Sequence, residues 1–130
     1  MKRYIVVLAM GLLVMTAIAW AAAAEKESMG AIKGEEVTLT GQFTCTFCRF
    51  AHPDKPCAAG CCVECIKAGD PPCLTDKDGN MYILLTNEIK KPVMTPERQQ
   101  LLGGSATVKG LLVKAKGVQA ILVDSIEKAE

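Results

Sequence analysis

All seven cysteines of this chain lie within the 29 residues from Cys45 to Cys73, and this cluster constrains the fold more than any other feature. The only histidine, His52, lies among them. Thiols at this density bind metal ions or form disulfides, and either use can stabilise a domain whose core is small. The compartment in which the protein works therefore matters for its interpretation.

The N-terminus predicts export. Lys2 and Arg3 precede an apolar run, and small residues end at Ala24, which fits a cleavable signal peptide over residues 1–24. We therefore expect a periplasmic or secreted protein. The alternative is an uncleaved anchor, because the apolar stretch is long enough to cross a bilayer. Only in that case do we expect contact with a membrane.

The rest of the chain is enough for one small domain, with a polar lead over residues 25–36 and a folded part over 37–130. Without Lys2 and Arg3, 13 basic residues face 14 acidic ones, and the single tryptophan lies in the predicted signal peptide. A near-neutral domain with few aromatic residues is unsuited to nucleic acid. The expected partners are a metal ion and, beyond it, a protein of the cell envelope.

Hydrophobic alternation predicts mostly strands. An apolar–polar alternation over 37–44 predicts a half-buried first strand. A hairpin is predicted over 74–85, with Gly79 in the left-handed position of its turn. Two final strands are predicted over 106–113 and 118–126.

A short helix is predicted between the two hairpins, because Thr95 can cap it, Pro96 can take its first position and Gly103 can end it. Gly41 and Gly110 lie inside strands, where a barrel would bend. This order of elements resembles the OB-fold, and in particular the small exported OB-like proteins of bacteria.

The resemblance implies a mainly β protein, a small five-stranded OB-like barrel with a short helix. Residues 45–73 would be a cysteine-rich helical insert after the first strand. We expect the barrel to be the scaffold and the insert to carry the function, because OB barrels serve many unrelated activities.

Two Cys-x-x-Cys pairs, Cys45/Cys48 and Cys62/Cys65, are separated by 13 residues and resemble zinc-ribbon knuckles. Two such pairs can close a tetrahedral site with Zn–S distances of about 2.3 Å. The remaining donors could form a second site: His52, Cys57, Cys61 and Cys73. The odd cysteine count also favours metal, because pairwise disulfides would leave a free thiol.

A predicted helix suggests another partition. With Asp54 as its cap and its end near Lys67, it would place Cys57, Cys61 and Cys65 on one face. The alternative site then consists of Cys48, His52, Cys61 and Cys65. Its spacing, followed by Gly69-Asp70-Pro71, resembles the pattern of small exported OB-like proteins. The two partitions share Cys48 and Cys65.

Other thiol chemistries fit less well. Neither pair is followed by histidine, which excludes covalent haem, and the ferredoxin spacing of an iron–sulfur protein is absent. Thiol–disulfide exchange favours a Cys-x-x-Cys at a helix start. We expect His52-Pro53 rather than a helix after the first pair, and the second pair near a helix end. Cys73 has a structural alternative, a disulfide to Cys57 or Cys45.

We therefore predict an exported protein that holds one or two soft metal ions in the cluster, zinc before copper or an iron–sulfur cluster. A fully ligated site has no open position, so a structural or metal-handling role is favoured over catalysis. The alternatives are a periplasmic thiol–disulfide redox protein and a disulfide-stapled OB-like interaction module.

Overall fold

The computed structural model describes residues 32–130, and Lys33–Glu130 form one compact unit. The predicted signal peptide and most of the polar lead lie outside the described residues. Within 32–130, no helix combines the length and the hydrophobicity needed to cross a membrane.

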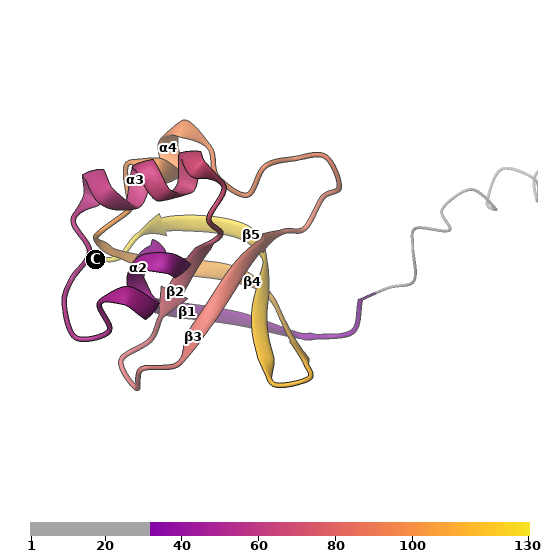
Figure 1. Cartoon of the computed structure of the whole chain (residues 1–130). Helices are drawn as coiled ribbons and strands as arrows, with labels where there is room; N and C mark the ends of the chain where they lie inside the picture. The colour runs from indigo at the N-terminus through magenta and orange to yellow at the C-terminus, as the bar shows by residue number, and fades with distance from the viewer. Residues whose placement is uncertain (1–31) are drawn as a thin grey trace, which may run out of the picture. The chain divides into compact units, whose positions relative to one another are not determined.

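Five strands close into a barrel in the order β1-β2-β3-β5-β4 (Figure 1). The strands are β1 (Glu35–Cys45), β2 (Pro72–Thr75), β3 (Met81–Thr86), β4 (Ser105–Ala115) and β5 (Val118–Lys128). The β3–β5 pair is parallel and the other pairs are antiparallel. This confirms the predicted mainly β, five-stranded OB-like barrel.

β1 follows its predicted alternation. Phe43 is fully buried in the barrel, whereas Thr38 and Thr40 are exposed on the opposite face. The strand closes the barrel because it pairs with β2 at one end and with β4 along most of its length. At Gly41 an added Cβ would collide with the Thr75 carbonyl, so only glycine fits this close approach.

Both predicted hairpins are present. Gly79 has a φ of 83°, as the first turn requires. The second turn is two residues long, with positive φ at both Lys116 and Gly117, which is the pattern of a type I′ turn. A register shift between Lys109 and Gly110 marks the expected irregularity in β4.

Within the described residues, three short helices accompany the barrel: α2 (Thr46–Ala51), α3 (Ala59–Ala68) and α4 (Pro96–Gln99). The Thr95 side chain accepts a hydrogen bond from the Arg98 N–H, which confirms the predicted cap of α4. α2 and α3 form the insert, and both lie at the end of the barrel where β1 finishes and β2 begins (Figure 1).

The predicted boundaries of the insert helices were wrong in two respects. α2 follows β1 directly, where no helix was expected before His52-Pro53. α3 begins at Ala59 rather than near Asp54, so Cys57 lies outside it. Pro56 disfavours helical geometry at Lys55, and the segment before Ala59 forms a loop instead. The predicted face of Cys57, Cys61 and Cys65 is therefore absent.

The insert shares the core of the barrel. Cys45, Cys48 and Cys62 belong to the same buried cluster as Phe43 and Leu84. Further apolar side chains of α3 pack against this cluster, namely Val63 and Ile66. These three thiols thus lie between the helices and the end of the barrel, away from bulk water.

Candidate metal centre

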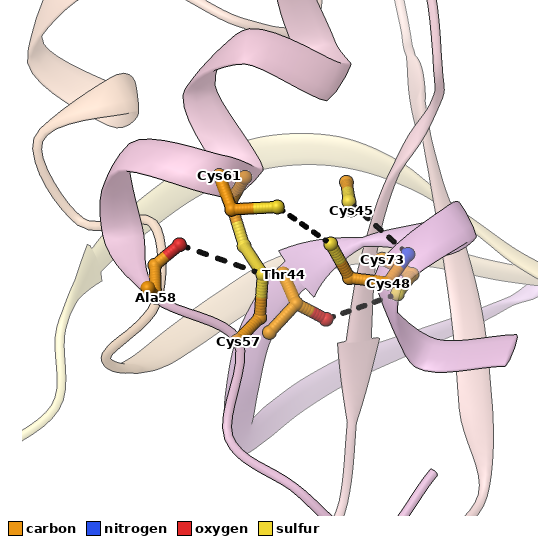
Figure 2. Close-up of a disulfide and its surroundings, with 8 residues drawn as sticks. Thr44, Cys45, Cys48, Cys57, Ala58, Cys61 and Cys73 are labelled. Carbon is orange, nitrogen blue, oxygen red and sulfur yellow. Dashed lines mark hydrogen bonds between the residues drawn. A yellow bond between two sulfur atoms is a disulfide. The ribbon is translucent and has the colours of Figure 1, made fainter. Parts of the chain in front are cut away.

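The first Cys-x-x-Cys pair spans the junction of β1 and α2. Cys45 is the last residue of β1 and caps α2, and its Sγ accepts a hydrogen bond of 3.4 Å from the Cys48 backbone N–H (Figure 2). Cys45 is fully buried and Cys48 nearly so. The start of α2 is also tied to the chain before β2, because the Thr46 N–H and hydroxyl both donate to the Pro71 carbonyl. This junction fixes two sulfurs against the barrel.

The second half of the centre comes from α3 and the loop before it. Cys62 is fully buried on α3, and Cys61 and Cys65 follow each other by one helical turn. The loop residue Cys57 is held close to Gly103, where an added Cβ would meet Ala59 Cα at 2.9 Å and the Cys57 carbonyl oxygen at 3.1 Å. A glycine after α4 thus lets the start of α3 approach the barrel.

The sulfurs gather in two groups, within each of which all Sγ atoms lie within 4.8 Å of one another. The four-thiol group consists of Cys45, Cys48, Cys57 and Cys62. The three-thiol group consists of Cys48, Cys61 and Cys65, and the Cys48 and Cys61 sulfurs are 3.5 Å apart (Figure 2). The cysteine cluster is therefore positioned to bind a metal ion, and Cys48 belongs to both groups.

Two members of the four-thiol group also form a disulfide, Cys57–Cys62. Their Cα atoms are 6.5 Å apart, within the range that disulfides span. Residues five apart on one helix would be rotated by about 140° and would diverge. The pair forms because Cys57 precedes α3 and can turn back towards Cys62. Sequence spacing missed this pair because the helix was predicted to begin before Cys57, whereas it begins after it.

The structure combines parts of both sequence partitions. Cys48, Cys61 and Cys65 come together as the second partition proposed, but the first knuckle pair gathers with Cys57 and Cys62 instead of Cys62 and Cys65. The two groups cannot be two independent four-ligand sites, since they share Cys48.

His52 and Cys73 belong to neither thiol group among the described residues. His52 is the exposed C-cap of α2, and its backbone N–H donates to the Cys48 carbonyl. Cys73 is fully buried on β2, where its Sγ lies 3.5 Å from the Thr44 hydroxyl (Figure 2). Cys73 is a free thiol, so the alternative disulfides to Cys57 or Cys45 were wrong.

Burial keeps these thiols protonated. Loss of hydration raises the pKa of Cys48 far above its ordinary value, and hydrogen bonds with Cys45 and Cys61 raise it further. Burial also raises the pKa of Cys65 to about 11, and that of Cys73 in the same direction. Without a cation these side chains are neutral near pH 7. A bound metal ion would supply the positive charge that stabilises the thiolates.

A cavity of about 190 Å³ opens beside the four-thiol group. Cys48 and Cys57 line it together with two basic residues, Arg49 and Lys55. The Arg49 guanidinium donates to the Pro53 carbonyl at 2.7 Å, which holds it at the rim of the loop. The acidic Asp54 lines the cavity as well, and the cavity gives small molecules a route to Cys57.

α2 changes the argument about thiol–disulfide exchange. Cys45 does lie at a helix start after a strand, contrary to the sequence-based expectation. It is nevertheless completely buried, and the pKa of Cys48 is raised rather than lowered. A nucleophilic thiol needs access and thiolate character. The structure therefore still disfavours this pair as a redox dithiol, but for reasons of burial.

The donor set fits a soft ion. Two thiolates bound to one tetrahedral zinc at about 2.3 Å are about 3.8 Å apart. This value lies between the 3.5 Å that separates the Cys48 and Cys61 sulfurs and the 4.8 Å limit on the sulfur–sulfur distances in the four-thiol group. Small side-chain movements can close the three-thiol group around an ion, and they can close the four-thiol group once the Cys57–Cys62 disulfide is reduced.

The chain matches no protein-family model, no curated protein and no solved structure. The interpretation of the centre therefore rests on its own geometry and chemistry.

Proposed function

We propose that this protein is an exported metal-binding protein that holds one soft metal ion, zinc in preference to copper(I), in its cysteine cluster. The observation that carries the proposal is the four-thiol group, Cys45, Cys48, Cys57 and Cys62, whose Sγ atoms lie within 4.8 Å of one another. Three separate segments contribute these thiols: the β1–α2 junction, the loop before α3, and α3 itself.

The chemistry of the donors supports a soft ion. Thiolate ligands select zinc, copper(I) or iron–sulfur clusters, and disfavour magnesium, calcium and manganese. Four thiolates suit tetrahedral zinc in a closed site, and such sites contribute directly to folding. Three of the four cysteines are part of the barrel core, so an ion here would join the insert to the barrel.

The first test is the metal content of the protein expressed from its whole sequence and purified under anaerobic, reducing conditions. Native mass spectrometry should find one zinc ion per chain, because the two thiol groups share Cys48. Cys48→Ser should lose the ion, whereas Cys73→Ser, a matched change of a cysteine in neither group, should retain it. His52→Ala should retain it as well.

Since Cys48 is part of the core, its variant could fail to fold, so Cys57→Ser provides a second probe at a half-buried loop position. We expect it to lower zinc affinity while the far-ultraviolet circular dichroism stays that of the wild type. Absence of metal from the reduced wild type, or unchanged affinity in both Cys48→Ser and Cys57→Ser, would refute the proposal.

The disulfide favours a second function, that of a thiol–disulfide redox protein. Cys57–Cys62 lies next to the free thiols of Cys45 and Cys48. This candidate predicts that the purified protein catalyses reduction or oxidation of a model disulfide substrate and binds no zinc in any redox state. The burial of Cys45 and the raised pKa of Cys48 weigh against it.

A further inference from the structure

The four-thiol group and the disulfide use the same two sulfurs, and this overlap extends the proposed function. Cys57 and Cys62 are ligands of the four-thiol group, yet they form a disulfide with each other. A disulfide sulfur has no negative charge to offer a metal ion. The four-thiolate site and the Cys57–Cys62 disulfide are therefore mutually exclusive states of the centre.

The three-thiol group survives in both states. Cys48, Cys61 and Cys65 are all free when Cys57 and Cys62 are bonded. Three thiolates leave the fourth position of a tetrahedral ion open to water or to an incoming ligand. Cys61 is exposed and Cys65 is half-buried, so this group lies nearer to solvent than the four-thiol group.

We propose that oxidation of Cys57 and Cys62 moves the metal ion from the closed four-thiolate site to the open three-thiolate site, from which it can be released or transferred. Cys48 belongs to both groups and remains a ligand throughout, so the ion need not leave the protein during the move. The inference rests on the proposed metal-binding function and adds its regulation.

The movement required is small and local. In a disulfide the two sulfurs are about 2.0 Å apart, and around one zinc ion they are about 3.8 Å apart. Their Cα distance of 6.5 Å allows both arrangements. Cys57 lies in the loop before α3, so a rotation of its side chain can make the change while Cys62 stays in the core.

The oxidant we infer is a small-molecule disulfide, RSSR, as found in oxidising compartments. The Cys57 sulfur attacks RSSR and releases one thiolate, and the Cys62 sulfur then displaces the second. Cys57 and Cys62 each lose one electron, RSSR gains two, and the metal ion keeps its charge. The cavity that Cys57 lines together with Arg49, Asp54 and Lys55 gives such a molecule access to Cys57.

The test compares zinc affinity in the reduced protein and in the protein oxidised with a small-molecule disulfide, using a competing chelating dye. Peptide mass mapping establishes that Cys57–Cys62 is the bond formed. Loss of a direct ligand should weaken zinc binding by at least the roughly 10- to 100-fold that loss of a second-shell partner costs. The cobalt(II) form should also lose thiolate-to-cobalt charge-transfer intensity on oxidation.

Three variants test what individual cysteines contribute to zinc binding in the reduced and oxidised states. Cys57→Ser removes the disulfide and one ligand, so its zinc affinity should be low and insensitive to oxidation. Cys61→Ser, at an exposed position of the three-thiol group, should lose the residual zinc binding of the oxidised protein. Cys73→Ser should behave as the wild type in both states.

The outcomes separate the two proposals. No zinc binding by the reduced wild type overturns both. Strong binding that is equal in the reduced and oxidised wild type overturns the switch and leaves the metal-binding function in place. Oxidation that joins another pair of cysteines, or full binding by oxidised Cys61→Ser, also overturns the switch.

Discussion

Asp76 shows how much one side chain can organise in this fold. Its Oδ1 accepts hydrogen bonds of 2.9 Å from the backbone N–H groups of Asp78 and Asn80. Its Oδ2 accepts from the Asn80 amide at 2.9 Å and from the Tyr82 hydroxyl at 3.2 Å. These bonds, with the Asn80 side chain as the largest contribution, hold the pKa of Asp76 below its ordinary value of 3.8.

We expect Asp76→Asn to lower the free energy of unfolding at neutral pH, because the amide cannot accept all four bonds. The carboxyl has a lower pKa in the folded than in the unfolded state. Its extra stabilisation is thus complete above the unfolded value, and it is lost as the pH falls through the folded one. Urea denaturation near pH 7 and near pH 2 should show a difference from the wild type that shrinks in acid.

The matched control is Asp78→Asn, since the Asp78 side chain makes none of these bonds. Its stability should follow that of the wild type at both pH values. An Asp76→Asn deficit that stays constant between neutral and acidic pH would contradict the assigned role of the charge.

At the scale of elements, the β4–β5 ladder depends on a glycine. The register shifts between Lys109 and Gly110. An added Cβ at Gly110 would collide with the Leu122 carbonyl oxygen and meet Ile121 Cγ2 at 2.9 Å. β4 and β5 can stay in contact at this bend only because residue 110 lacks a side chain.

Gly110→Ala should therefore reduce the free energy of unfolding by about 1–3 kcal/mol, the usual cost of overpacking. Gly60→Ala is the control, because Gly60 lies in α3 with nothing within 4 Å of an added Cβ. This change should be neutral or stabilise by up to about 1 kcal/mol through helix propensity. Denaturant titrations of both variants test the expectation, and a Gly110→Ala protein as stable as the wild type would refute it.

For the molecule as a whole, we propose export, with removal of residues 1–24. Protein expressed from the whole sequence in a bacterium should then be recovered from the envelope fraction. Its intact mass should correspond to a chain that begins at Glu25. A chain that keeps Met1 and sediments with the membranes would instead support the uncleaved anchor.

The sequence was a reliable guide to the barrel. Its strands follow an alternation with a period of two residues, and its turns depend on single residues such as Gly79 and Gly117. Thr95 and Pro96 likewise define the start of α4. All these features act between residues close in the chain, so they can be recognised before the fold is known.

The grouping of the cysteines was predicted only in part from the sequence. Spacing predicted that Cys61 and Cys65 lie together, because residues four apart share one face of a helix, and both meet Cys48 as the second partition proposed. It failed for Cys57, whose position depends on where α3 starts and on how closely the loop can approach Gly103. Spacing also predicted His52 as a ligand, and the structure places it as the exposed C-cap of α2, in neither thiol group of residues 32–130.

By itself, the sequence determined that a five-stranded barrel carries an insert rich in thiols, since strand periodicity, turn residues and cysteine density are local properties. Only the tertiary structure decided which thiols meet. β1, the loop before α3, and α3 each place their sulfurs through contacts with parts of the chain that are distant in sequence. The competition of the disulfide and the four-thiol group for Cys57 and Cys62 is a consequence of that packing.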